Sequence, residues 1–493
     1  MKIREQFLNA RKFGVPLIAI QTADPGATIQ TLVQALNGDK KYPALSWDIV
    51  RGMKAANEYG KEAFKKLAPT EEEALNLINP TNMLSRILEL PDKAVVFMYN
   101  APRFYENEAV AQGIWNLRDP FKATGRTLVL LGPSIKLPSE LYYDVILFDE
   151  QLPNDAELGQ IISGVHEYAG LKPPKDEQQK SLVQAARGLA PFPAEQAVAL
   201  SLSKEGVNIE MLWELKRKMI EQTPGLTMYV GGPTFDDIGG ITRLKDFGRR
   251  LFAGPERPSV IVQVEEMEKM LAGASSDTSG TSQDQLMVML DEMEQMQWKG
   301  IILVGHPGTC KTMYAKSIGA THKVPTLRFD AGAMKDQFVG SSEKRIRSVM
   351  KVIKGMAGAN AYWIATCNSL PVVSPALVRR FTDGIYFTDL PDENEKPFIW
   401  AVNEKVFNVS GKRPEDTNYT GADIRNICSI AYRLKVSLVE AATYITPVAK
   451  SDPQSIERLR KQADGSWLSA TYPGVYQLDR KKGDWKGDRK VEL

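Results

Sequence analysis

One short segment constrains the fold of this chain more than any other. It reads Gly305-His306-Pro307-Gly308-Thr309-Cys310-Lys311-Thr312, after an apolar run at Ile301–Val304 and before a predicted helix at Met313–Ile318. A glycine-rich turn between a strand and a helix surrounds a phosphate with backbone N–H groups. In such a turn Lys311 reaches the β- and γ-phosphates and Thr312 ligates Mg²⁺. The segment therefore predicts a phosphate-binding loop, with ATP and Mg²⁺ as cofactors.

Cys310 departs from the usual pattern, which has glycine before the lysine. A residue with a side chain has less backbone freedom than glycine, so the thiol is expected to fit under constraint. The alternative is a chance glycine-rich turn. The strand, the loop, the Lys-Thr pair and the helix occur together in the right order, which favours the phosphate loop.

Short β-branched runs alternate with longer helical patterns, which predicts an α/β fold with parallel sheets. Two sections of five strands share this plan, and a helix-rich stretch follows each. The predicted strands are Val15–Ile20, Ala44–Val50, Ala94–Tyr99, Thr127–Leu131 and Val145–Phe148, then Val260–Val264, Ile301–Val304, Thr326–Phe329, Tyr362–Ala365 and Ile385–Phe387. We interpret this as a weak internal duplication, that is, tandem modules of a five-stranded parallel sheet and a helical lid. The alternative is the general likeness of α/β sheets.

The predicted boundaries divide the chain into six segments. They are an α/β module at 1–154, a helical lid at 155–222, a linker at 223–234, a second α/β module at 235–391, a second lid at 392–450 and a C-terminal extension at 451–493. At roughly 100–200 residues per domain, a chain of 493 residues is expected to hold two to four domains.

Charge and cysteine content exclude several classes of protein. Lys+Arg 62 against Asp+Glu 60 gives a net charge of +2, so there is no global attraction to nucleic acid or to an anionic membrane. The three cysteines are far apart and form no CxxC motif, which argues against a disulfide framework or a zinc site. No apolar run approaches the ~18 residues of a membrane span. The sequence therefore predicts a cytoplasmic protein.

ATP hydrolysis also needs an acidic strand end that holds Mg²⁺ and the attacking water. Downstream of the loop, where it is usually found, no apolar strand ends in paired acids. Upstream, the predicted strand Val260–Val264 runs directly into Glu265-Glu266. The alternative is that these two residues only begin a solvated helix.

Five segments together resemble AAA+ ATPases of the AAA clade. Besides the phosphate loop, they are Phe235–Gly240, Phe338–Glu343, Ala365–Asn368 and Ser374–Phe381. The resemblance covers about residues 234–447, whereas the first half resembles, less specifically, the degenerate leading module of certain plastid and bacterial AAA proteins. The order differs from that family, because the acidic strand precedes the phosphate loop. We interpret this as a permuted, transposed strand–helix unit, which leaves the spatial order of a sheet possible.

The resemblance implies a role for each matching residue. Glu265 would hold the water shell of Mg²⁺, Glu266 would polarise the attacking water and Asn368 would sense the γ-phosphate. Arg379 and Arg380 match the arginine-finger region, which reaches a neighbouring subunit's site; their alternative is a solvated surface pair. Asp237, Ile238 and Gly239 match the turn that contacts adenine. In the lid, Arg425 is either a nucleotide sensor or a surface residue.

The triplet Phe338-Val339-Gly340 matches the loop that lines the central pore of AAA rings and grips polypeptide. The alternative is a phenylalanine packed under its own loop. The resemblance thus favours a homo-oligomer, preferably a hexamer, that remodels or threads a protein substrate or works with a protein adaptor. A nucleic-acid motor and a nucleotide-dependent scaffold with weak hydrolysis are the alternatives.

The leading module lacks this chemistry. Its first predicted strand is followed by Gln21–Gly26, without a Gly-Lys-Ser/Thr sequence, and its third ends at Tyr99-Asn100. We therefore predict that it serves assembly or partner binding.

Overall fold

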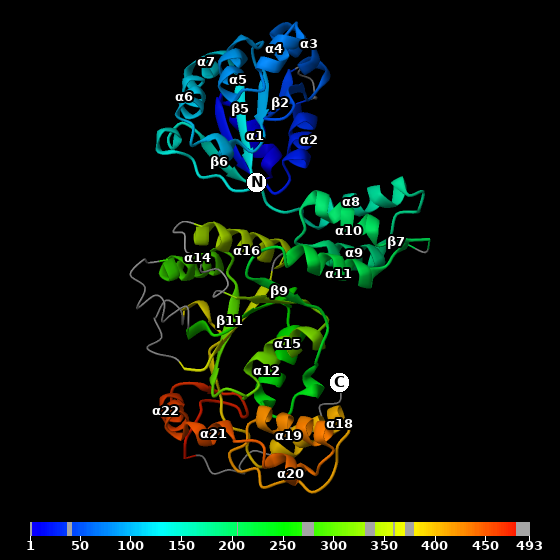
Figure 1. Cartoon of the computed structure of the whole chain (residues 1–493), viewed down its shortest axis with the longest axis vertical. Helices are drawn as coiled ribbons and strands as arrows, with labels where there is room; N and C mark the ends of the chain where they lie inside the picture. Colours follow the sequence, from blue (N-terminus) through cyan, green and yellow to red (C-terminus); the bar gives the residue numbers. More distant parts are fainter. Residues whose placement is uncertain are drawn as a thin grey trace. The chain divides into compact units, whose positions relative to one another are not determined.

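The computed structural model describes residues 2–36, 42–204, 206–268, 281–330, 341–357, 360–369 and 379–479. They form two compact units (Figure 1). The first unit holds Met1–Val183 and Leu189–Gly206, and the second holds Gln184–Gly188 and Val207–Leu493.

The first unit is built on a six-stranded sheet in the order β3-β2-β4-β5-β1-β6. All neighbours are parallel except the β2–β3 hairpin. The strands are β1 (Leu17–Gln21), β2 (Ala44–Asp48), β3 (Gly52–Ala55), β4 (Val95–Met98), β5 (Thr127–Gly132) and β6 (Ile146–Asp149). The hairpin turns because the Asp48 carboxylate accepts hydrogen bonds from the backbone N–H groups of Val50 and Arg51.

Helices cover both faces of this sheet, as a buried parallel sheet requires. Leu17 and Ala19 of β1 point into one apolar core, and Ile18 and Ile20 point into the other, which is the two-residue period of a strand. Helices α1 and α2 pack on the second core, and α3, α5, α6 and α7 on the first. The helices are α1 (Ile3–Lys12), α2 (Pro25–Leu36), α3 (Glu58–Leu67), α4 (Glu71–Asn76), α5 (Pro80–Arg86), α6 (Glu108–Asn116) and α7 (Arg118–Thr124), with short 3-10 turns at Ile87–Glu89, Ala101–Phe104 and Ser139–Leu141.

A helical section follows the first sheet. It contains α8 (Asp155–Tyr168), α9 (Asp176–Ala186), α10 (Pro191–Leu200), β7 (Leu202–Ser203), β8 (Gly206–Val207) and α11 (Ile209–Ile220). Helix α11, which falls inside the predicted first lid, belongs to the second compact unit.

The second unit is built on a seven-stranded sheet in the order β15-β14-β11-β13-β10-β12-β9. The strands are β9 (Leu226–Tyr229), β10 (Val260–Val264), β11 (Lys299–Gly305), β12 (Thr326–Phe329), β13 (Ala361–Cys367), β14 (Ile385–Thr388) and β15 (Leu468–Ser469). Strand β10 precedes β11 in the chain but lies between β13 and β12 in the sheet, parallel to both.

Two pairs of helices sandwich the second sheet (Figure 1). Helices α12 and α15 share a core with β10, β11 and β13, and α14 and α16 pack together on the other side. The helices are α12 (Thr242–Ala253), α14 (Thr281–Gln295), α15 (Lys311–Thr321), α16 (Ser341–Ala357), α18 (Lys396–Phe407), α19 (Gly421–Leu434), α20 (Leu438–Ala442), α21 (Val448–Ser451) and α22 (Pro453–Ala463), with a 3-10 turn at Phe235–Asp237.

All ten predicted strands are present, which confirms the α/β class, and β3, β9 and β15 extend the two sheets. The segment predicted to be a linker contains a strand, β9, which pairs antiparallel with β12. Its side chains Leu226 and Met228 are buried, so the segment is part of the folded unit and not an exposed linker. The predicted C-terminal extension contains β15. Its anchor is Asp389, which receives hydrogen bonds from Arg460 and from Tyr476.

Among the residues that the structure describes, none of the helices combines the length and the apolar surface needed to cross a bilayer.

Candidate nucleotide-binding site

The predicted phosphate loop connects β11 to α15. The chain reverses there because Gly308 (φ 86°) and Cys310 (φ 63°) both adopt left-handed backbone conformations. Glycine does this freely, whereas cysteine does it at a cost of about 1–2 kcal/mol. The sequence predicts a constrained backbone at Cys310, and the structure has this residue in a left-handed conformation directly before the first turn of α15. Burial raises the pKa of its thiol to about 11.

Lys311 is folded back onto the loop that carries it. Its Nζ atom donates hydrogen bonds to the carbonyl oxygens of Gly305, at 2.7 Å, and His306, at 2.8 Å. Burial lowers the pKa of this ammonium group to about 8, and the nearby Glu268 carboxylate opposes that shift. The lysine is thus buried at the centre of the loop, where a phosphate would compete with the two carbonyls for its protons.

Two threonine hydroxyls tie the loop to the end of β14. Thr309 Oγ1 donates to the carbonyl of His306 at 2.8 Å and lies 2.9 Å from Thr388 Oγ1. Thr388 Oγ1 also lies 3.2 Å from the Val304 carbonyl. These buried contacts hold the loop in a single conformation. Thr312 lies half-buried in the first turn of α15.

The turn predicted to contact adenine packs close to the loop. Asp237 forms a reciprocal capping box with Thr234, Ile238 is buried, and Gly239 packs directly against the backbone of Ile399 in α18. Lys245 donates a hydrogen bond to the carbonyl of Ile238. The turn is therefore held between α12 and the helices that follow the sheet.

Helix α19 also meets the loop. A Cβ atom on Gly308 would lie only 2.7 Å from Thr420 Oγ1, and one on Gly421 would lie 3.3 Å from Cys310 Sγ. Thr420 caps α19 in a reciprocal box with Asp423. Sequence reasoning missed Thr420, although the sequence Thr420-Gly421-Ala422-Asp423 is a visible capping pattern. Arg425, the possible sensor, lies over the ring of Phe407 at 5.4 Å.

The acidic residues after β10 lie in three different environments. Glu265 forms an ion pair with Arg328 of β12 at 2.6 Å and accepts a hydrogen bond from Gln263. Glu266 is exposed and has a left-handed backbone, with φ 51°. Glu268 instead lies by β13 and accepts a hydrogen bond from the backbone N–H of Asn368 at 3.2 Å. Sequence reasoning named the first two and missed Glu268, which stands in the same acidic run.

The two finger candidates differ. Arg380 donates to the carbonyl of Leu290 and forms an ion pair with Glu294, both in α14. Arg379 is exposed. The pore-loop candidates Phe338, Val339 and Gly340 lie outside the described residues.

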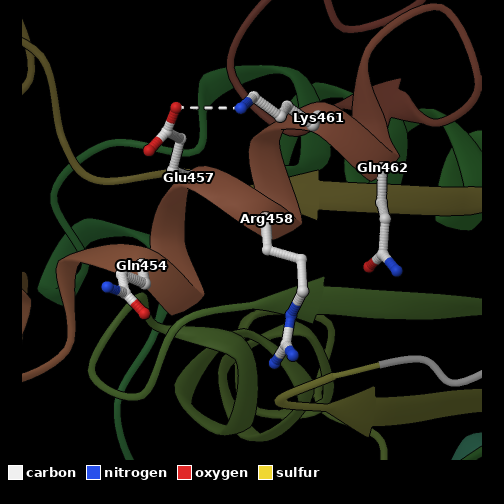
Figure 2. A pocket seen from close by; sticks show the side chains of 5 residues that line it. All are labelled: Gln454, Glu457, Arg458, Lys461 and Gln462. Atoms are coloured by element: carbon white, nitrogen blue, oxygen red, sulfur yellow. Dashed lines mark ion pairs between the residues drawn. The ribbon is translucent and has the colours of Figure 1, made fainter.

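A further surface feature lies on helix α22. A hollow of about 420 Å³ is lined by five side chains of α22, and Glu457 pairs with Lys461 within it at 3.0 Å (Figure 2). The lining residues are Gln454, Glu457, Arg458, Lys461 and Gln462. It shares no residue with the phosphate loop.

Comparison with known families supports the interpretation of both units. Residues 301–359 match the model of the ATPase family associated with various cellular activities (AAA), and residues 4–150 match the model of the N-terminal domain of SpoVK-like AAA ATPases. Two segments of the chain are thus similar to AAA-family proteins, and the match at residues 301–359 supports ATPase activity. The AAA match begins at the strand that leads into the phosphate loop, so it includes Lys311 and Thr312.

Individual relatives show the same pattern. An uncharacterized AAA domain-containing protein, ycf46, of Guillardia theta is 21% identical, over 95% of this chain and 96% of its own. Two further relatives match only part of the chain. The ATP-dependent zinc metalloprotease FtsH 2 of Bdellovibrio bacteriovorus is 24% identical over 31% of this chain and 34% of its own. A katanin p60 ATPase-containing protein of Xenopus laevis is 24% identical over 39% of this chain and 42% of its own.

Proposed function

We propose that this ATPase is a motor that works as a ring of identical subunits, preferably six, and remodels or threads a protein substrate. The observation that carries the proposal is the buried Lys311 ammonium in a loop that α19 touches through Gly308. A phosphate bound there would engage the loop and the helical section together. ATP binding and hydrolysis would therefore move one part of the unit against the other, as a motor requires.

The residues of the loop fit a nucleotide with Mg²⁺. Lys311 and the first-turn N–H groups of α15 would bind the phosphates, and the turn at Asp237, Ile238 and Gly239 would bind the base. Mg²⁺ is usually held by one or two carboxylates and by the phosphates themselves. Thr312 and an acid of the turn after β10 would provide the protein's share. Bound Mg²⁺ would neutralise charge on the phosphates during hydrolysis.

In this proposal β10 is the acidic strand. It belongs to a strand–helix unit that is transposed, so that it precedes the phosphate loop in the chain. The support for this assignment is the place of β10 between β13 and β12, with Val264 opposite Ala365. That register brings the acidic turn to the sheet edge where the phosphate loop begins, because the ends of parallel strands meet there. Glu266 would polarise the attacking water, and Asn368 would orient it. Glu265 would take part in holding the metal once it leaves Arg328.

A ring is supported by the contrast between the two arginines. Arg380 is engaged by α14 of its own chain, whereas Arg379 is exposed and has the length to reach a neighbouring site. Positive charge supplied by a neighbour stabilises the transition state of phosphoryl transfer. We therefore assign the finger to Arg379, with Arg380 as its support.

Mixing two inactive variants tests the ring. Arg379→Ala lacks the finger but keeps its own acid, and Glu266→Gln lacks the acid but keeps the finger. Mixed rings contain sites with both groups, so turnover is expected to exceed the sum of the two separate variants. Arg250→Ala is the matched control, because Arg250 is an exposed arginine paired with Asp246 within α12. Additive turnover in the mixture would contradict shared sites.

The substrate class is tested by stimulation of ATPase turnover. Unfolded protein, single-stranded DNA and double-stranded DNA are added separately to the full chain. A protein-threading motor is stimulated by unfolded protein, and Phe338→Ala loses that stimulation but keeps basal turnover. Stimulation by DNA alone would favour a nucleic-acid motor. A variant that loses basal turnover or melts at a lower temperature would place Phe338 in the core instead of a pore.

A further inference from the structure

Of the three carboxylates after β10, Glu268 is the one whose charge acts on the lysine of the phosphate loop. Glu265 is engaged by Arg328 and Gln263 on the side of β12. Glu266 is exposed. Glu268 turns the other way, so that its negative charge acts on Lys311 and on the end of β13.

The contact between Glu268 and β13 lies just beyond the end of the strand. The pairing of β13 with β11 ends at Cys367, opposite Val304. The next backbone N–H belongs to Asn368, and Glu268 Oε1 accepts its hydrogen bond at 3.2 Å. The carboxylate therefore binds the first backbone N–H group beyond β13. Without it, the N–H group at the end of β13 would lose the partner that fixes the direction of Asn368.

The other carboxylate oxygen, Glu268 Oε2, is shielded from solvent and accepts no well-formed hydrogen bond among the described residues. The Cys367 thiol lies nearby, and burial together with the Glu268 carboxylate raises its pKa. A buried carboxylate with few donors is costly, because its charge is poorly compensated. That charge lies beside Lys311, where a phosphate would bind.

We propose that Glu268 is a positioning residue of the nucleotide site, which holds Asn368 through its backbone N–H and places a negative charge beside Lys311. The inference rests on the proposed function, since it concerns how the same site hydrolyses ATP. One oxygen positions the residue that orients water. The charge of the carboxylate, which both oxygens share, keeps the lysine from binding an anion too tightly, because it repels the phosphates that Lys311 attracts.

Two variants separate these tasks. Glu268→Gln keeps an oxygen that accepts the Asn368 N–H but removes the charge. Glu268→Ala removes both. Turnover and KM are measured for ATP, and affinity is measured separately with a fluorescent ATP analogue. Glu256→Gln and Glu256→Ala are the matched controls, because Glu256 is an exposed acid paired with Lys299.

The expected results differ between the variants. Glu268→Gln keeps kcat within about threefold of the wild type and binds the analogue about threefold to tenfold more tightly. Glu268→Ala loses about tenfold or more in kcat, because Asn368 is no longer held, while KM changes less. Rescue of kcat by glutamine and its loss with alanine is the signature of positioning.

Three outcomes would overturn the inference. They are wild-type turnover in Glu268→Ala, a kcat in Glu268→Gln as low as in Glu268→Ala, and unchanged or weaker analogue binding in Glu268→Gln. The last stands even if the alanine variant does not fold. A wild-type chain that neither binds nor hydrolyses ATP would instead contradict the proposed function itself.

Discussion

The two units place opposite charges at the same point of their folds. In each, a central parallel strand runs through a short loop into a helix, β1 into α2 and β11 into α15. The second loop carries the ammonium of Lys311. The first carries the carboxylate of Asp24, whose Oδ1 accepts the N–H of Ala27 at 3.0 Å in the first turn of α2.

The first loop also binds its own helical section. Asp24 Oδ2 accepts the N–H of Phe192 at 3.0 Å, in the first turn of α10. One carboxylate thus bridges two helix N-termini, which are the groups that bind phosphate in nucleotide sites. In the second unit the corresponding contact is between Gly308 and Thr420, and no carboxylate of the described residues bridges them. The first unit has a carboxylate of its own where, in the proposed function, the second accepts an anion from a nucleotide.

A hydroxyl network supports the fixed anion of the first unit. Thr22 Oγ1 lies 2.8 Å from Thr28 Oγ1, and Thr28 Oγ1 donates to Glu150 at 2.6 Å. These groups link the start of α2 to the segment after β6. The first unit therefore differs from the second by more than the absence of a lysine. The helix N-termini are also satisfied internally, so the first unit is expected to be rigid without nucleotide.

The largest effect is expected from removing Lys311, the positive charge that distinguishes the second loop from the first. Lys311→Ala is expected to weaken ATP binding about a hundredfold, because the loop keeps its N–H groups but loses the buried cation. Titration with a fluorescent ATP analogue measures this. Lys299→Ala, an exposed lysine of the same strand–loop region, is the control. Near-native affinity in Lys311→Ala would show that the phosphate site lies elsewhere.

The ammonium of Lys311 also predicts a pH dependence. Its pKa is lowered to about 8 by burial, and bound phosphates raise it again, so binding takes up a proton above that pH. The affinity for ATP should therefore be constant below about pH 8 and fall by up to tenfold per pH unit above it. Lys311→Arg is the control, because guanidinium stays charged and should remove the slope. An equal slope in both proteins would assign the effect to another group.

Asp24 provides the reciprocal test in the first unit. Asp24→Ala removes two backbone contacts and should destabilise that unit by about 1–2 kcal/mol. Faster amide hydrogen exchange in α2 and α10 would report the loss. Asp24→Asn, which keeps one oxygen acceptor, should lose less. ATP binding at the second unit should not change, and unaltered exchange in Asp24→Ala would refute the role of the fixed anion.

The sequence predicted what depends on continuous patterns. Most of the predicted strands are short runs rich in apolar residues, and the phosphate loop is one unbroken segment. The missing elements depend on three-dimensional contacts. Strands β9 and β15 are only four and two residues long, and each forms because a partner edge lies beside it. Glu268 was missed because it differs from Glu265 in the strand that its side chain lies beside, and a run of acidic residues does not reveal such contacts.

The smallest expected effect concerns Cys310 of the second loop, whose backbone conformation is unfavourable for a residue with a side chain. Its left-handed backbone costs about 1–2 kcal/mol for a residue with a Cβ atom. Cys310→Gly removes that cost but loses about 0.5–1 kcal/mol through the greater freedom of the unfolded chain, as well as the packing of Sγ near Gly421. Stability should therefore change by less than about 1 kcal/mol, and turnover by less than about threefold. Cys310→Ala, which keeps Cβ without Sγ, separates the packing from the backbone. Thermal melts and ATPase assays on both variants check this. If Cys310→Gly raised ATPase turnover tenfold, the thiol would restrain hydrolysis in the natural chain. The chain would then work more as a nucleotide-dependent scaffold than as a motor.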